Sequence, residues 1–228
     1  MIRRNIALIP AAGVGARFGA GKPKQYVEIN GKTVLQHTIE IFEQHPRIDL
    51  IAVILSPEDS VFQTALSEKV RVFRVGGASR AESVRNGVST LLEQGLAEAQ
   101  DNILVHDAAR CCLPAEALTR LLDEAEESNE GGILAIPVAD TLKRADGSHH
   151  IDETVARAGL WQAQTPQLFQ TALLNRALSV DDLSEITDEA SAVEKLGIRP
   201  RLVQGDTRNL KLTLPQDEYI VRLLLKAV

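Results

Sequence analysis

The stretch "IALIPAAGVGARFGAGKPKQY", residues 6–26, predicts a buried strand followed by an anion-binding loop. The apolar run 6–9 is continuous rather than alternating, which is typical of a strand covered on both faces. Glycines and small residues follow, together with Arg17, Lys22 and Lys24. Glycines let backbone N–H groups approach phosphate oxygens, and cations neutralise phosphate charge, so we predict a triphosphate-binding loop. A surface loop with solvated cations is the alternative interpretation.

The charge of the whole chain contrasts with the charge of this loop. The 228 residues have a formal net charge of −6, whereas the first 27 contain five Arg or Lys and no Asp or Glu. Binding to nucleic acid usually needs a basic face, so the acidic balance argues against a nucleic-acid partner. A locally cationic loop in an acidic protein instead favours a small anionic ligand.

The chain has the features of a cytoplasmic protein. No apolar run approaches the length of a membrane span, and the N-terminus lacks the apolar stretch of a signal peptide. The two cysteines, Cys111 and Cys112, are adjacent, which makes them poor candidates for a structural disulfide. We therefore predict a protein of a reducing compartment, the cytoplasm, with no membrane partner.

Apolar runs alternate with segments of helical period along the chain, and together they predict the fold class. The predicted strands are residues 5–10, 50–55, 70–75, 102–107, 131–138 and 199–204, and the predicted helices are 34–44, 58–67, 80–94, 188–196 and two that begin near 114 and 215. Strands with continuous apolar runs are covered on both faces by helices. The pattern predicts one α/β domain over residues 1–228, with a Rossmann-like, doubly wound, mostly parallel sheet.

Local signals mark the ends of two of these helices. Ser79 and Glu82 have the spacing of a capping box at the start of helix 80–94. Thr187 is the predicted N-cap of helix 188–196, and Gly197 is its predicted stop.

A polar segment, residues 141–170, interrupts the alternation of strands and helices. It contains an Asp146-Gly147 turn signal between two extended polar stretches, which is typical of a β-hairpin. So polar a segment is not expected inside the core. We therefore predict an arm over residues 141–160 that projects from the domain.

The glycine spacing of the opening loop argues against a nicotinamide cofactor. Gly13, Gly15 and Gly19 form G-x-G-x-x-x-G, whereas the dinucleotide fingerprint has its third glycine where Phe18 stands. A dehydrogenase is therefore a distant alternative.

Asp107 ends the buried strand 102–107, at the edge of the sheet where ligands bind in folds of this class. A carboxylate there is costly unless it is paired or bound to a metal. Contact with a metal or a nucleotide is one interpretation, and a salt bridge to Arg110 is the other.

Seven motifs resemble one enzyme family in order along nearly the whole chain. They are "PAAGVGARFGAGKPKQY" (10–26), "GGASRAESV" (76–84), "VHDAAR" (105–110), "PVADTLKRA" (137–145), "GLWQAQTPQ" (159–167), "EITDEASAVEKLG" (185–197) and "NLKLTLPQDE" (209–218). The family is that of the cytidylyltransferases that activate 2-C-methyl-D-erythritol 4-phosphate in isoprenoid synthesis. The resemblance implies attack of the substrate phosphate on the α-phosphorus of CTP, with loss of pyrophosphate. A phosphomonoester is already mostly dianionic at pH 7, so this reaction needs positioning and charge neutralisation rather than a general base.

The resemblance also implies a role for each matching residue. Arg17 and Lys24 would stabilise the transition state; Ala11, Ala12, Gly13, Gly15, Gly77, Ser83, Asp107 and Ala108 would bind CTP; and Arg110, Thr141, Arg157, Thr187 and Lys211 would bind the substrate phosphate. Asp107 would lie near a Mg²⁺ ion held mainly by the triphosphate. In relatives the arm crosses to a second subunit, which implies a homodimer formed through residues 141–160.

Two other functions are compatible with the opening loop. One is a cytidylyltransferase for another polyol phosphate, such as ribitol 5-phosphate. The segments "DTLKR" (140–144) and "ARAGLWQAQTPQ" (156–167) favour methylerythritol phosphate over it. The other is a nucleotide-sensing module without turnover, and the presence of Arg17, Lys24 and Lys211 speaks against it.

Overall fold

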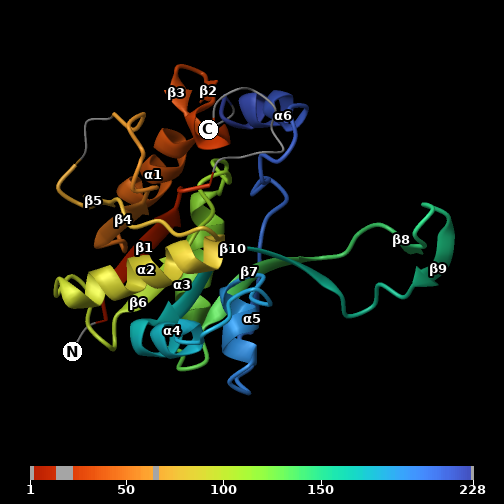
Figure 1. The fold of residues 1–228 in the computed structure, drawn as a ribbon. Helices are drawn as coiled ribbons and strands as arrows, with labels where there is room; N and C mark the ends of the chain where they lie inside the picture. Colours follow the sequence, from red (N-terminus) through yellow and green to blue (C-terminus); the bar gives the residue numbers. More distant parts are fainter. Residues whose placement is uncertain (1–2, 14–22, 64–66, 227–228) are drawn as a thin grey trace.

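The computed structural model describes residues 3–13, 23–63 and 67–226. In these residues seven strands form one central sheet, in the order β11-β7-β10-β6-β1-β4-β5 (Figure 1). The strands are β1 (Asn5–Pro10), β4 (Leu50–Ile54), β5 (Val70–Phe73), β6 (Asn102–Val105), β7 (Gly132–Pro137), β10 (Trp161–Gln170) and β11 (Arg201–Gln204). All neighbouring strands pair in parallel except β10, which is antiparallel to both β6 and β7. The predicted mostly parallel sheet is confirmed.

Helices cover both faces of this sheet, as the continuous apolar strands predict. The helices are α1 (Val34–Gln44), α2 (Arg80–Glu93), α3 (Ala115–Ala125), α4 (Thr171–Leu178), α5 (Glu189–Glu194) and α6 (Asp217–Leu224), with a 3₁₀ turn η1 (Lys24–Tyr26). Buried residues of α1 and α3 pack with Ala7 and Ile9 of β1 in one core cluster. Buried residues of α2, α4 and α5 pack with Ile6 and Leu8 in a second cluster. Successive residues of β1 therefore point into opposite layers, which is the doubly wound arrangement.

The starts of α2 and α5 can be compared with the capping signals in the sequence. The capping box of α2 is present: the Ser79 side chain accepts from the Glu82 backbone, and the Glu82 side chain reaches back to the Ser79 backbone. The predicted N-cap of α5 is wrong by one residue, because Asp188 rather than Thr187 caps it and forms a capping box with Ser191. Gly197 follows α5 with φ of +78°, a conformation that favours glycine.

The predicted helix 58–67 is wrong in the part that the structure describes. The carboxylate of Asp59 accepts hydrogen bonds from the backbone N–H groups of Val61 (3.1 Å) and Phe62 (3.0 Å) and from the Tyr26 hydroxyl (2.5 Å). Short polar side chains that bind nearby backbone groups in this way compete with helix formation. Residues 58–63 form an irregular loop, and the Asp59 bond to Tyr26 fastens this loop to η1.

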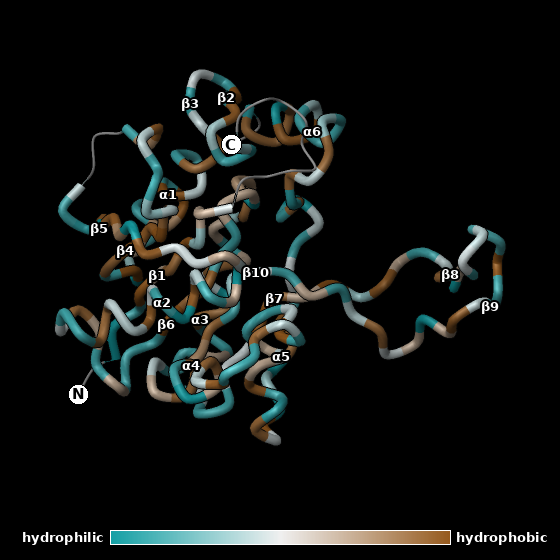
Figure 2. Tube along the Cα trace, in the orientation of Figure 1, coloured by the Kyte–Doolittle hydropathy of each residue, from teal (hydrophilic) through white to brown (hydrophobic). Residues whose placement is uncertain are grey.

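The polar segment 141–170 divides into two parts. The strands β8 (Leu142–Ala145) and β9 (Ile151–Val155) pair only with each other and lie far from the central sheet (Figure 1). Hydrophilic and hydrophobic residues both occur along this hairpin (Figure 2), and Ile151 is 67% exposed. The second part, 161–170, is β10, so the expectation that the whole segment is too polar for the core is wrong. The buried polar residues of β10 have hydrogen-bond partners, which removes the cost of burying them.

Among the described residues, no helix combines the length and apolar character needed to cross a bilayer.

Gly76 follows β5 and lets two loops approach closely. A Cβ at this position would contact the Ala12 Cβ and lie 2.8 Å from the Leu55 carbonyl oxygen, which is backbone and cannot move aside. Gly76→Ala is expected to lower the free energy of unfolding by about 1–3 kcal/mol, measured by urea denaturation. Gly147→Ala on the arm is the control, because a Cβ there would meet no atom within 4 Å and stability should not change. Equal stability of both variants would contradict this close contact.

Candidate functional site

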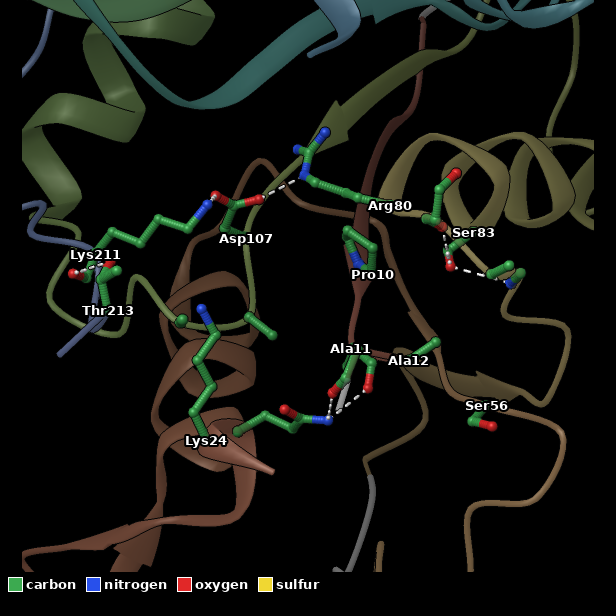
Figure 3. Close-up of a pocket in the computed structure, with 17 residues that line it drawn as sticks. Pro10, Ala11, Ala12, Lys24, Ser56, Arg80, Ser83, Asp107, Lys211 and Thr213 are labelled. Carbon is green, nitrogen blue, oxygen red and sulfur yellow. Dashed lines mark hydrogen bonds and ion pairs between the residues drawn. The ribbon is translucent and has the colours of Figure 1, made fainter. Parts of the chain in front are cut away.

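A cleft of about 720 Å³ opens at the carboxyl ends of β1 and β6. Its walls come from the loop after β1, the start of η1, the segment between β5 and α2, the loop after β6, and the segment that contains Lys211 and Thr213. Figure 3 shows Lys24, Asp107 and Lys211 on one side of Pro10, and Ser83 on the other. This is the edge at which sheets of this class bind ligands.

The structure brings most of the predicted nucleotide residues together. The predicted residues that line the cleft are Ala11, Ala12, Gly13, Lys24, Gly77, Ser83, Asp107, Ala108 and Lys211. Gly15 and Arg17 lie outside the described residues. Of the predicted phosphate-binding residues, Arg110 lies beside Asp107, and Thr187 is exposed just before α5. Thr141 and Arg157 lie at the two ends of the arm and do not line this cleft.

Asp107 is held by cations on both carboxylate oxygens. The Nε of Arg80 lies 2.7 Å from Oδ1, and the Nζ of Lys211 lies 2.7 Å from Oδ2. The Nε of Arg110 is 3.8 Å from Oδ2, so the predicted salt bridge exists but is the longest of the three. Burial alone would raise the pKa of Asp107, but the charges of Arg80 and Lys211 outweigh burial and hold this pKa well below its usual range. The carboxylate is therefore ionised throughout the physiological range.

Arg80 is the central cation of this cluster, and the sequence prediction missed it. Its Nη1 and Nη2 lie 2.6 and 3.0 Å from the two carboxylate oxygens of Glu189, a residue that is 1% exposed. Arg80 is the first residue of α2, where the helix dipole disfavours a cation. A cation at such a position needs a compensating partner, and this was the one available signal for its role.

The backbone of the loop after β6 is fixed from β10. The Asp107 N–H donates to Thr165 Oγ1 (3.1 Å), and this hydroxyl also bonds the Nδ1 of His106 (3.0 Å). The Nε2 of His106 lies 3.0 Å from the Arg110 carbonyl oxygen and must carry the proton to bond it. Nδ1 then accepts from the Thr165 hydroxyl, which leaves that oxygen free to accept from Asp107. Thr165 thus orients the residue on which the cation cluster converges.

His106 is fully buried, and burial lowers its pKa to about 4. Because the unfolded chain takes up a proton near the ordinary histidine pKa, the unfolded state binds more protons than the folded state between pH 6.5 and 4. The free energy of unfolding is therefore expected to fall by about 3 kcal/mol from this residue as the pH is lowered from 7 to 4. Urea denaturation of His106→Gln should show a shallower pH dependence than the unmodified chain. His150→Gln, at an exposed position on the arm, should leave the dependence unchanged, and equal slopes for all three proteins would contradict the assignment.

The wall opposite Asp107 is built by side chains of α2. The N–H of Gly77 donates to Ser83 Oγ (3.1 Å), and the N–H of Ala78 donates to Glu82 Oε2 (2.6 Å). Ser83 Oγ in turn donates to the Ser79 carbonyl (2.9 Å). A side chain on Gly77 would collide with Glu82, so the chain can follow this path only with glycine there. These contacts fix the backbone of 77–79 as a rigid wall.

On the remaining side, the described start of the opening loop, residues 11–13, is fastened to η1. The Nε2 of Gln25 donates to the carbonyl oxygens of Ala11 and Gly13, each at 2.9 Å. Lys24, the residue before Gln25, lines the cleft (Figure 3). The bonds of Gln25 therefore set the position of η1, and with it the position of Lys24, relative to the end of β1.

The described residues of the cleft could supply only a few of the ligands of a metal ion. Among the described residues there is no group of three or more His, Cys, Asp or Glu side chains that could hold an ion. Asp107 is the one carboxylate among the described residues that line this cleft, and both of its oxygens already accept from cations. A Mg²⁺ ion here would take most of its ligands from phosphate and water, which is its usual preference at phosphate sites.

Comparison with known proteins identifies close relatives of the whole chain. The family model for 2-C-methyl-D-erythritol 4-phosphate cytidylyltransferase, IspD, matches residues 5–227. A protein of that name from Neisseria meningitidis serogroup C / serotype 2a is 69% identical over 231 residues, covering 100% of both chains.

Solved structures give the same result. A crystal structure described as 4-diphosphocytidyl-2C-methyl-D-erythritol synthase is 63% identical, with a TM-score of 0.89 over 99% of this chain and 100% of that one. The 2-C-methyl-D-erythritol 4-phosphate cytidylyltransferase of Francisella tularensis is 32% identical, with a TM-score of 0.82 over 97% and 99% of the two chains. The likeness therefore extends over the sheet, the cleft and the arm.

Proposed function

The chain belongs to the 2-C-methyl-D-erythritol 4-phosphate cytidylyltransferase family, and we propose that the cleft around Asp107 is where it joins its two substrates. As a member it is a nucleotidyltransferase of isoprenoid synthesis, and its substrates are CTP and 2-C-methyl-D-erythritol 4-phosphate. The alternative substrate, ribitol 5-phosphate, is not favoured by any of these relatives.

The observation that carries this placement is the charge of the cleft. Lys24, Arg80 and Lys211 line it, and Asp107 is the one carboxylate among its described lining residues. Such a site complements a triphosphate and a phosphomonoester together. Fixed cations stabilise charge that moves onto phosphate oxygens without reorganising during the reaction.

The reaction is a direct exchange at the α-phosphorus of CTP. A phosphate oxygen of the polyol substrate forms a new bond to this phosphorus, the bond to the β-phosphate oxygen breaks, and pyrophosphate leaves with the electron pair. The attacking phosphate is already ionised, so no proton has to be removed from it. His106 is not a candidate base, because it is buried and bonded on both ring nitrogens.

The residues predicted from the sequence then have proposed tasks. Lys24, together with Arg17 of the opening loop, stabilises the charge that develops on the triphosphate. Gly77 and Ser83, on the wall formed by 77–79 and the start of α2, contact the cytosine base. Ala11, Ala12, Gly13, Gly15 and Ala108 enclose the nucleotide, and Lys211 and Arg110 attract the substrate phosphate.

We propose Mg²⁺ as the cofactor, held mainly by the triphosphate, with Asp107 as the nearest protein carboxylate. When bound, the ion would neutralise part of the triphosphate charge. Asp107 remains ionised for this task because Arg80 and Lys211 keep its pKa low.

The arm supports a proposed homodimer. Thr141 and Arg157 are predicted to bind the substrate phosphate, yet they lie at the arm and not at the cleft of their own chain. An arm that reaches a second copy would bring Thr141 and Arg157 to the cleft of that copy. There they would form the phosphate site together with Thr187 of the partner subunit.

A complementation experiment tests this exchange. Lys24→Ala and Arg157→Ala chains carrying different tags are co-expressed, and the mixed dimer is purified. If arms exchange, one of its two sites has both residues intact, so the mixed dimer should recover about half of the unmodified activity. If each arm serves its own cleft, both sites stay defective and no activity returns. A monomer by light scattering would also contradict the proposal.

We also propose that the protein acts in the cytoplasm. Cys111 and Cys112 are both free thiols, which fits a reducing compartment.

Pyrophosphate release tests the function directly. CTP, UTP, ATP and GTP are each supplied with methylerythritol phosphate or with ribitol 5-phosphate, with Mg²⁺ or with EDTA. Release confined to CTP, methylerythritol phosphate and Mg²⁺ is expected. Release with ribitol 5-phosphate instead would support the nucleotide cleft but contradict the proposed substrate. Absence of pyrophosphate release under every condition would favour a nucleotide-sensing module.

A further inference from the structure

A chain of three ion pairs runs from α5 to the edge of the cleft. Glu189 bonds Arg80 through both carboxylate oxygens, Arg80 bonds Asp107 through Nε, and Asp107 bonds Lys211. We propose that Glu189 is a positioning residue for the transfer reaction: it holds Arg80 in the orientation in which Arg80 and Lys211 each take one oxygen of Asp107. The proposal deepens the function above and rests on the roles assigned there to Asp107 and Lys211.

The geometry of Arg80 shows why its second anion matters. Glu189 occupies both terminal nitrogens of the guanidinium, which leaves only the Nε edge for Asp107. Without the Glu189 charge, the terminal nitrogens would be free to form a two-pronged contact with Asp107 or with a phosphate group in the cleft. A two-pronged contact with Asp107 would compete with Lys211 for Oδ2. The position of Lys211 therefore depends on a residue that does not line the cleft.

Glu189 itself is rigidly placed. Gln167 of β10 bonds both sides of the helix start, because its Nε2 donates to Asp188 Oδ2 (2.9 Å) and its Oε1 accepts from the Ala190 N–H (2.9 Å). Glu189 stands between these two residues and is fully buried. The position of Arg80, and through it of Asp107 and Lys211, is therefore tied to β10 and α5.

Glu189 also links the proposed phosphate site to the proposed nucleotide site. Thr187, which we propose to contact the substrate phosphate, precedes Glu189 by two residues, while Arg80 precedes the proposed base contact Ser83 by three. The ion pairs fix the starts of α2 and α5 relative to each other. A change at Glu189 should therefore disturb the phosphate site and the in-line geometry more than the binding of the nucleotide base.

The test uses the neutral isostere Glu189→Gln, with Glu126→Gln as the matched control. Glu126 also bonds an arginine, Arg47, but it lies at the other end of the sheet, where β1 begins, and contacts Asn5. For each purified full chain, kcat and KM are measured by pyrophosphate release, the Kd for CTP by calorimetry, and the midpoint of thermal unfolding by circular dichroism.

Glu189→Gln is expected to lower kcat by about 10- to 100-fold, since displacement of reacting groups by about 1 Å can cost that much. Its KM for methylerythritol phosphate should rise several-fold, while the Kd for CTP stays within about threefold. Glu126→Gln should lower the unfolding midpoint and leave kcat and both affinities unchanged. Glu189→Asp, which keeps the charge on a shorter side chain, should recover part of the lost kcat.

Several results would overturn the proposal. If the unmodified chain is active and Glu189→Gln has kcat and KM within twofold of it, Glu189 does not position the site. If both Gln variants lose activity only in proportion to their unfolded fraction, the role of Glu189 is structural alone. If Glu189→Gln does not fold, Glu189→Asp decides: full activity in that variant would overturn the proposal and a lower kcat at normal CTP affinity would support it. An inactive unmodified chain would instead overturn the proposed function.

Discussion

Lys24→Ala is expected to lower kcat by about 10²- to 10³-fold while the Kd for CTP rises by less than about tenfold. Lys24 lines the cleft at the start of η1, and Gln25 fastens that turn to the loop after β1. A cation that meets charge developing on the triphosphate interacts more strongly with the transition state than with bound CTP. Its removal should therefore affect turnover more than binding. Steady-state kinetics and calorimetric titration with CTP measure the two quantities separately.

Lys32→Ala is the matched control for this variant. Lys32 is an exposed lysine eight residues further along, and its Nζ pairs with Glu40 at 2.7 Å, away from the cleft. Neither kcat nor the Kd for CTP should change in this variant. Equal losses of turnover and affinity in Lys24→Ala would show instead that Lys24 binds the ground-state triphosphate.

Asp107→Asn is expected to reduce both activity and stability. The substitution keeps the shape of the side chain but leaves Arg80, Arg110 and Lys211 without the anion on which they converge. Removing one partner of a buried ion pair typically costs about 3–5 kcal/mol. The cost here should fall near the lower end of that range, because Arg80 keeps Glu189 and the partly exposed Lys211 can turn to solvent. We expect kcat to fall by at least about 10²-fold, since Lys211 loses the anion that fixes its position.

Acid denaturation gives an independent measure of the same residue. The pKa of Asp107 is lower in the folded chain than in the unfolded chain, so its charge stabilises the fold above the unfolded pKa of about 3.9. This stabilisation is lost as the pH falls below that value. Asp107→Asn should therefore flatten the acid limb of a plot of unfolding free energy against pH. Asp181→Asn, at an exposed position before α5, should leave it unchanged, and an identical acid limb in all three proteins would contradict this account.

The sequence predicts well where the deciding interactions are local. The bounds of α1 follow from the spacing of Leu35, Ile39 and Phe42 and agree with the structure. The capping box of α2 joins residues three positions apart, so it can be recognised in the sequence. The parallel strands β1, β4, β6 and β7 are predictable for the same reason, because a continuous apolar run is visible in the sequence without knowledge of its neighbours.

The errors arise where partners are distant in the sequence. β10 looks too polar for the core, yet Thr165 bonds Asp107 from 58 positions away and Gln167 bonds Asp188 from 21. Arg80 and Glu189 are 109 positions apart, and nothing local to either shows that they form a pair. The helix prediction for residues 58–63 is wrong for the opposite reason. The Asp59 carboxylate accepts from the nearby N–H groups of Val61 and Phe62, and these local bonds compete with helix formation.

The way in which the arm joins the sheet has a consequence for the evolution of the fold. The arm leaves from the end of β7 and returns at the start of β10, and Pro137 and Trp161 face each other across these two adjacent strands. The Val138 N–H donates to the Leu160 carbonyl next to this pair. The two limbs of the arm separate as they leave the central sheet (Figure 1). In its connectivity, the arm is thus an enlarged loop of a β7–β10 hairpin. It can lengthen, shorten or be replaced by a tight turn across generations while every strand pair of the central sheet is preserved. The length of the arm and the pairing of the central sheet are therefore free to diverge separately.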